Sequence, residues 1–63
     1  MASFTVEIDM DNAAFEDSPT GELSRILRKL AKEIADGTET DTVIKLRDIN
    51  GNTVGTAIYD GGQ

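Results

Sequence analysis

The 63-residue chain contains no cysteine and no histidine. Without cysteine it can form neither a disulfide framework nor a thiolate metal site. Without histidine it lacks the most frequent general base, the most frequent zinc ligand and the side chain that titrates near neutral pH. Tryptophan is absent as well, and the aromatic residues are Phe4, Phe15 and Tyr59. These absences exclude most enzyme chemistry, and we expect a protein that is not an enzyme and binds no cofactor or metal.

Long apolar runs are also missing. No stretch approaches the roughly 18 apolar residues that a membrane span needs. The first residues, Met1-Ala2-Ser3-Phe4, show neither the basic nor the apolar region of a signal peptide. We therefore expect no membrane partner and a location in the cytoplasm. The length allows a single small domain over residues 1–63.

The chain is strongly acidic, with 12 Asp and Glu against 6 Lys and Arg and a net charge of −6 at pH 7. Residues 22–36 sum to +1 and the remaining residues to −7. Because binding to a phosphate backbone depends on Lys and Arg, the composition argues against a nucleic-acid partner. An acidic body with one basic stripe suits electrostatic attraction to another protein.

Residues 3–10 alternate between apolar and polar side chains, with Phe4, Val6 and Ile8 on one face. This period of two predicts a half-buried strand. Residues 11–18 show no such period, and turn-forming residues at both ends predict a loop. Phe15 in this loop either plugs the end of the core or serves as an exposed anchor for a partner.

A helix is predicted from Ser18 to Gly37. Serine is a favoured N-cap, Pro19 suits the first helical position, and Gly37 suits the left-handed stop. The apolar residues follow at spacings of three and four and form one stripe: Leu23, Ile26, Leu27, Leu30, Ala31 and Ile34. Four basic residues lie nearly opposite that stripe: Arg25, Arg28, Lys29 and Lys32.

Two further strands are predicted over residues 42–48 and 52–59. A two-residue Asn50-Gly51 loop would pair Leu46 with Gly55 and split the apolar residues between both faces. A type I turn that begins at Asp48, with Gly51 in a bulge, pairs Asp48 with Asn52 and Leu46 with Val54. We favour the second register because one face must be consistently apolar.

The predicted fold is α+β with the order β-α-β-β, a three-stranded, mainly antiparallel sheet with one helix on one face. Strand order 1-3-2 is favoured, and order 3-2-1 stays open. We expect an ordered core over about residues 3–59 and a frayed tail over 60–63. The predicted core consists of Phe4, Val6, Ile8, Leu23, Ile26, Leu27, Leu30, Ile34, Ile44, Leu46, Val54 and Ile58.

The acidic segments do not match a calcium loop. A loop that begins at Asp9 would place Ala14 where an EF-hand needs glycine, and Thr20 where it needs glutamate. A loop that begins at Asp48 places Thr53 at the glycine position, and the hairpin turn already explains Asp48. The sequence therefore predicts no specific metal site.

Three surfaces are candidates for protein contact. The first is the polar loop, with Asp11, Asn12, Phe15, Glu16 and Asp17. The second is the basic stripe of the helix, with Arg25, Arg28, Lys29 and Lys32. The third is the sheet face that no helix covers, which in the favoured register carries Val43, Lys45, Ala57 and Tyr59 and is a possible homodimer face.

Three strings in the chain resemble a family of small uncharacterised proteins from tailed bacteriophages and prophages. They are Asp11-Asn12-Ala13-Ala14-Phe15-Glu16-Asp17, then Arg25-Ile26-Leu27-Arg28-x-Leu30-Ala31, then Leu46-Arg47-Asp48-x-Asn50-Gly51-Asn52-x-Val54-Gly55. The resemblance implies a phage-encoded protein in the cytoplasm of a bacterial host. It transfers no catalytic residue, because the family has no assigned activity.

Together these points predict a small acidic protein that works by protein–protein interaction. It would modulate or inhibit a host protein, such as a defence or regulatory factor. The alternative is a homodimeric accessory, assembly or virion-associated protein. The partner would be a host or phage protein.

Overall fold

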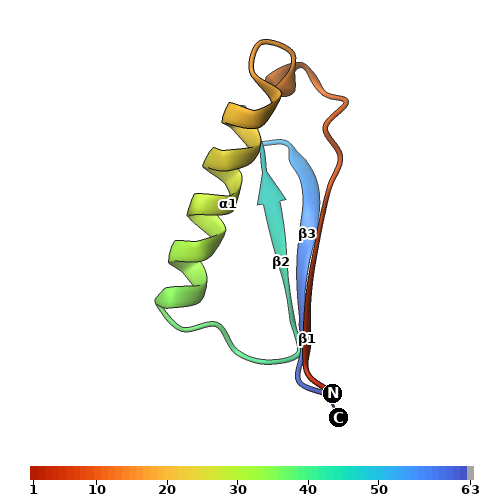
Figure 1. Ribbon diagram of the computed structural model, residues 1–63, viewed down its shortest axis with the longest axis vertical. Coiled ribbons are helices and arrows are strands. Elements are labelled where there is room, and N and C mark those ends of the chain that lie inside the picture. The colour runs from red at the N-terminus through yellow and green to blue at the C-terminus, as the bar shows by residue number, and fades with distance from the viewer. Residues whose placement is uncertain (63) are drawn as a thin grey trace.

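A computed structural model describes residues 1–62. Its elements are β1 (Ser3–Ile8), the 3-10 helix η1 (Ala13–Phe15), α1 (Pro19–Ala35), β2 (Thr42–Arg47) and β3 (Thr53–Asp60) (Figure 1). Within residues 1–62, neither helix combines the length and the apolar character needed to cross a membrane.

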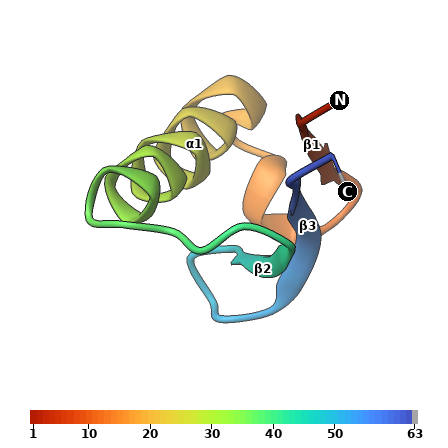
Figure 2. The same ribbon diagram turned by 90° about the horizontal axis from the view of Figure 1, so that it is seen from below.

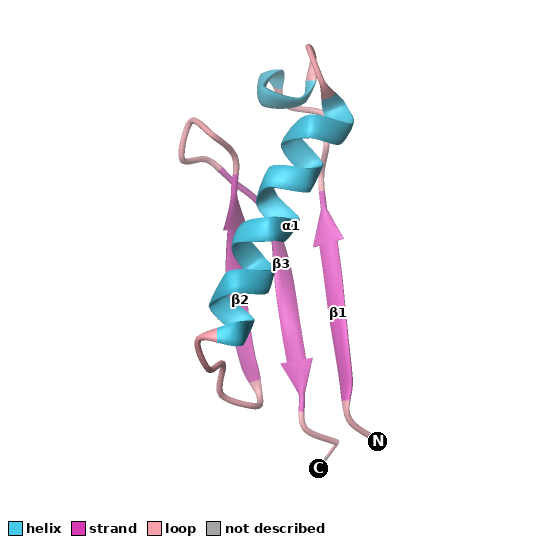
Figure 3. Cartoon of the chain, turned by 60° about the vertical axis from the view of Figure 1, so that its left-hand side comes forward, coloured by secondary structure: helices cyan, strands magenta, loops and turns pink. Residues whose placement is uncertain are grey.

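β3 lies between β1 and β2 and runs antiparallel to both, so the strand order is β1-β3-β2. The predicted α+β architecture and the order 1-3-2 are confirmed, and the order 3-2-1 is wrong. Figure 3 shows α1 on one side of the sheet, toward β2 and β3, with β1 at the outer edge. We call this the helix-bearing side of the sheet and the opposite side the bare side.

α1 begins and ends where the sequence predicts. The Oγ of Ser18 accepts a hydrogen bond from the N–H of Gly21 at 3.2 Å, and Pro19 occupies the first helical position. The helix ends at Ala35, and Gly37 follows with a φ of +106°. These signals act within one turn of the chain, which is why the sequence alone reveals them.

The segment before α1 folds into η1 rather than an irregular loop. The Oδ1 of Asn12 caps it by accepting the N–H of Ala14 at 2.7 Å. Phe15 is 2% exposed and belongs to the hydrophobic core. Of the two roles predicted for Phe15, the core role is confirmed and the exposed anchor is wrong.

The turn between β2 and β3 has the predicted form. The N–H of Gly51 donates to the carbonyl oxygen of Asp48 at 3.0 Å. The N–H of Asp48 donates to the carbonyl oxygen of Asn52 at 2.9 Å. Gly51 has a φ of +85°, the left-handed conformation that this turn requires.

Beyond the turn, the favoured register is wrong. Arg47 pairs with Thr53, but Leu46 pairs with Gly55, which leaves Val54 as the extra residue of a β-bulge. The predicted pair of Leu46 with Val54 requires that β3 alternates without interruption. The bulge shifts the alternation by one residue and turns each later side chain to the other side of the sheet.

This shift corrects the predicted dimer face. Ala57 is fully buried at 0% exposure, and Tyr59 shares its side of the sheet, the helix-bearing one. Both residues were predicted for the bare side, and that placement is wrong. Ile58, predicted for the core, is instead 44% exposed on the bare side, where it pairs with Val43.

Gly55 lies where β1 approaches the bulge. A Cβ at this position would overlap the carbonyl oxygen of Glu7 and lie 2.9 Å from the Cα of Ile8. Backbone atoms cannot rotate aside as a flexible side chain does. We therefore expect Gly55→Ala to lower the free energy of unfolding by about 1–3 kcal/mol, measured by urea unfolding.

Gly61→Ala is the matched control for this substitution. A Cβ at Gly61 would lie 3.4 Å from the Cβ of Thr40, close to ordinary contact. We expect this variant to stay within about 0.5 kcal/mol of the parent protein. Equal losses in the two variants would show that the close approach of β1 is not what demands glycine at position 55.

The core is smaller than the sequence predicts. Its buried apolar residues are Phe15, Ile26, Leu30, Leu46, Val54 and Ala57, with Ile8, Ala14 and Ile44 packed against them. Four residues predicted for the core keep 39–41% of their surface exposed: Phe4, Val6, Leu27 and Ile34.

The C-terminal segment includes the end of β3 and two hydrogen-bonded glycines. Asp60 belongs to β3 and pairs with Ser3. The N–H of Gly61 donates to the Oδ1 of Asp41 at 2.9 Å, and the N–H of Gly62 donates to the Oδ1 of Asp60 at 2.9 Å. Gln63 lies outside the described residues.

Candidate functional site

A polar cluster around Asp48 joins the β2–β3 turn to the segment before α1. The Oδ1 of Asp48 accepts the N–H groups of Asn50 and Asn52, each at 2.9 Å. Its Oδ2 accepts the side-chain amides of Asn12 at 2.5 Å and of Asn52 at 3.2 Å. These bonds, led by that from Asn12, hold the pKa of Asp48 below its ordinary value.

Glu22, in the first turn of α1, makes a second junction with the same turn. Its carboxylate accepts Nε of Arg25 at 2.7 Å, Nη2 of Arg25 at 3.1 Å and the N–H of Ile49 at 2.8 Å. Arg25 also donates to the carbonyl oxygen of Arg47 at 3.2 Å. The hydrogen bond with Arg25 is the main cause that lowers the pKa of Glu22, and it raises the pKa of Arg25.

These junctions change the role of two predicted contact residues. Asn12 and Arg25 use their side chains to hold the fold together. The other predicted polar contact residues are exposed: Asp11, Glu16, Asp17, Arg28, Lys29, Lys32 and Lys45. Within residues 1–62, the acidic side chains form no group of three or more that could hold a metal ion.

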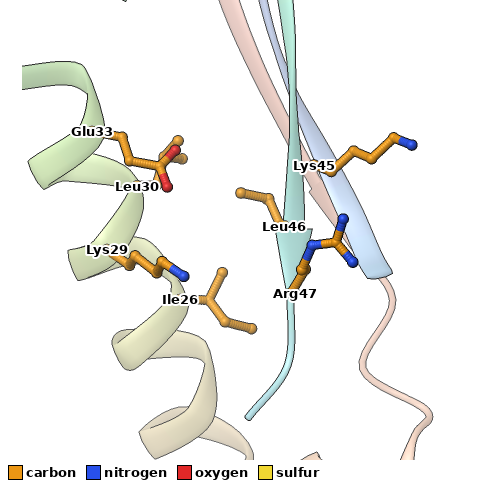
Figure 4. Close-up of a pocket in the computed structure, with 7 residues that line it drawn as sticks. All are labelled: Ile26, Lys29, Leu30, Glu33, Lys45, Leu46 and Arg47. Atoms are coloured by element: carbon orange, nitrogen blue, oxygen red, sulfur yellow. The ribbon is translucent and has the colours of Figure 1, made fainter. Parts of the chain in front are cut away.

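A small hollow separates α1 from β2. Ile26, Leu30 and Leu46 line it, with Lys29 and Glu33 at its helix side (Figure 4). The head group of Lys45 points away from the helix in the same view. The hollow holds about 110 Å³, whereas ligand pockets span about 300–1,000 Å³. It is therefore too small for a substrate or cofactor.

An apolar surface lies on the helix-bearing side. β1 contributes Phe4 and Val6, which alternation places on the same side as the buried Ala57. α1 contributes Leu23, Leu27, Ala31 and Ile34, all from the half of its stripe that points away from β2. We name these six residues the open apolar face.

The rotation of α1 about its axis explains why this face is open. Hydrogen bonds from Ile49 to Glu22 and from Arg25 to Arg47 fasten the first turns of α1 to the β2 side. With the helix held there, Ile26 and Leu30 meet the core, and the other half of the stripe does not. Figure 2 shows α1 on one side of the sheet. In Figure 3, α1 crosses in front of the sheet obliquely, with its first turn toward the β1 side and its last turns toward β2.

The helical part of the open apolar face forms a shallow depression. Leu23, Leu27 and Ala31 line it, with Thr20 and Arg28 at its margin. Figure 1 shows α1 diverging from the sheet toward its C-terminal end, where Ile34 is 41% exposed. On the β1 side, the rings of Phe4 and Tyr59 lie 5.9 Å apart and extend the apolar surface.

Comparison with protein-family models, with curated proteins and with solved structures finds no match. The site therefore has to be argued from its own residues.

The sequence predicts a core position for every residue of this face except Ala31, and predicts none of them as a contact site. The width of the apolar stripe of α1 is the feature of the sequence that indicates exposed apolar residues. At 100° per residue, the apolar positions from Ile26 to Ala31 span about 140° of the helix, more than a narrow sheet covers. The sequence did not indicate which half would remain open, because that depends on the contacts of Glu22 and Arg25.

Proposed function

We propose that the chain is a non-enzymatic protein that acts by binding another protein through its open apolar face. The observation that carries the proposal is the 39–41% exposure of Phe4, Val6, Leu27 and Ile34 on the side of the sheet that holds the core. Large apolar side chains left exposed on one side of a small protein favour contact with another molecule there.

The state of the buried carboxylates supports a non-enzymatic role. Glu22 and Asp48 both have lowered pKa values, because each accepts several hydrogen bonds. A general acid or base works best with a pKa near the working pH. These two groups are instead suited to stay charged at neutral pH and to hold the turn, η1 and α1 together.

The resemblance to bacteriophage and prophage proteins supports a partner in the bacterial cytoplasm, either a host protein or a phage protein. The net charge of −6 supports a protein partner over a nucleic acid. On this proposal the chain modulates a host defence or regulatory protein by occupying an apolar site on its surface. The alternative homodimeric accessory protein would use the same face, because a second copy covers it equally well.

Affinity capture from nuclease-treated bacterial lysate, read by mass spectrometry, tests the contact surface. The informative variant is Leu27→Gln, and its matched control is Lys32→Gln, also at an exposed position of α1. Because Leu27 supplies apolar area at the contact, we expect Leu27→Gln to reduce recovery of the partner about tenfold or more. Lys32→Gln should retain it.

Two outcomes would overturn the proposal. Loss of the partner in Lys32→Gln but not in Leu27→Gln would assign contact to the basic stripe instead. A chain that captures no protein and also remains monomeric would leave the open apolar face without any protein contact. Circular dichroism of each variant confirms that its helix is retained.

A further inference from the structure

β1 has an outer edge that lacks the usual protection against pairing. Among residues 1–62, β1 pairs with β3 on one side and with no strand on the other. Its residues Ser3–Ile8 carry one charge, on Glu7, and include neither proline nor lysine. The other outer strand, β2, carries Lys45 and Arg47. Since natural proteins guard exposed edges with such charges, β1 is the edge left free to accept another strand.

The backbone of β1 is oriented for such an addition. The N–H of Asp9 points to β3, where it donates to the carbonyl oxygen of Val54 at 2.7 Å. Successive N–H groups of a strand alternate between its two edges. The N–H groups of Phe4 and Val6 therefore point to the outer edge.

The molecule also exposes more surface than a monomer of its size requires. Its accessible surface is 4535 Å², whereas a monomer of this mass exposes about 3,950 Å². Its radius of gyration is 12.4 Å, against about 10.6 Å for a compact domain of this length. The excess is about 585 Å² per chain and about 1,170 Å² for two chains, close to the roughly 1,200 Å² total of the smallest stable interfaces.

We propose that two copies of the chain pair antiparallel through their β1 edges, about a two-fold axis, into a six-stranded sheet. This inference rests on the homodimeric alternative of the proposed function, in which a second copy, and not a host protein, meets the open apolar face. The two-fold axis runs perpendicular to the sheet, so both helices lie on the same side.

Pairing in this way joins the β1 parts of the two open apolar faces, Phe4 and Val6 of each copy. Side chains directly opposite each other in an antiparallel pair point to the same side of the sheet. In every symmetric register, Phe4 and Val6 therefore meet the equivalent row of the second copy on the helix-bearing side. Any symmetric pairing centred on Thr5 or Val6 also keeps the two Glu7 side chains from facing each other directly. The dimer thus reduces apolar exposure without opposing like charges.

Sedimentation equilibrium of the full chain, from micromolar to millimolar concentration, tests the dimer. The interface variant is Val6→Lys, and the matched control is Val43→Lys, which places the same side chain at an exposed valine of the other outer strand. We expect the parent chain and Val43→Lys to sediment at twice the chain mass. Val6→Lys should raise the dimer dissociation constant about tenfold or more.

Three results would overturn the dimer: a parent chain that stays monomeric throughout, a Val6→Lys dimer as tight as the parent, or loss of the dimer in Val43→Lys alone. The last would move the contact to the bare side of the sheet. Hydrogen exchange of the parent chain gives a second test that needs no variant. The amides of Phe4 and Val6 should become more protected as concentration rises, and unchanged protection would contradict the pairing.

The two proposals fail separately. A monomeric chain that still captures a partner through Leu27 would overturn the dimer and leave the proposed function standing. A monomeric chain whose partner is unaffected by Leu27→Gln would overturn both.

Discussion

Replacing Phe15 by alanine is expected to leave the chain largely unfolded at room temperature. Phe15 is 2% exposed and is one of the six buried apolar residues that form the core within residues 1–62. Removing a buried phenylalanine ring costs about 3–5 kcal/mol, and a single hydrophobic core in a chain of this length rarely supplies more than about 3–5 kcal/mol of stability in total. Thermal unfolding followed by far-ultraviolet circular dichroism measures the loss directly.

Ile49→Ala is the matched control, because it also removes apolar side-chain atoms from the same end of the fold. Ile49 is 69% exposed, so we expect a change within about 0.5 kcal/mol. Phe15→Leu should fall between the two. An alanine variant at position 15 that melts at the parent temperature but loses its partner would return Phe15 to the role of a contact residue.

The helix could be predicted from the sequence because its signals are local. Ser18 and Pro19 set its start and Gly37 its stop within one turn each, and the spacing of apolar residues sets its identity. The Asp48–Asn52 turn belongs to the same class, since Asp48 and Gly51 define it without distant partners. Features of this kind need no knowledge of the tertiary fold.

The strand register was missed because alternation was assumed to hold through Gly55. A glycine inside a strand is a recognised sign of a bulge or of close backbone approach. Gly55 marks both a bulge and a close approach. The bulge lies at the neighbouring Val54, and the carbonyl oxygen of Glu7 occupies the space that a Cβ at Gly55 would need. One extra residue was enough to exchange Ala57 with Ile58 between the two sides of the sheet.

The open apolar face could not be predicted for a different reason. The sequence shows how wide the apolar stripe of α1 is, but the half that meets the sheet depends on contacts between distant segments. Glu22 accepts the N–H of Ile49, and Arg25 donates to Arg47, more than 20 residues away in each case. These contacts rotate the helix toward β2, and they therefore decide which apolar residues remain exposed.

The second large effect is expected at Asp48. In Asp48→Asn the new amide would face the side-chain amides of Asn12 and Asn52, which now donate to the carboxylate. Donor groups would then oppose donor groups in a nearly buried site, where an unpaired polar group is costly. We expect the melting temperature of Asp48→Asn at neutral pH to fall much further than that of the control variant Asp17→Asn. Asp17 is suitable as the control because its carboxylate is exposed.

The same carboxylates should make the protein sensitive to acid. The pKa values of Glu22 and Asp48 are lowered in the folded chain, so the unfolded chain binds protons at a higher pH than the folded one. Their stabilising contribution is therefore complete at neutral pH and is lost as the pH falls below about 4, toward the folded pKa values. We expect the melting temperature to be steady near neutral pH and to drop steeply in acid.

Asp48→Asn also separates this effect from the general loss of charge. An asparagine at this position resembles the protonated carboxylic acid, because both present a donor to Asn12. The melting temperatures of the parent chain and Asp48→Asn should therefore differ most at neutral pH and approach each other in acid. Melting curves of the parent chain and of Asp48→Asn, recorded from neutral pH into acid, test this expectation. A constant difference at every pH would show that ionisation of Asp48 does not hold the β2–β3 turn to η1.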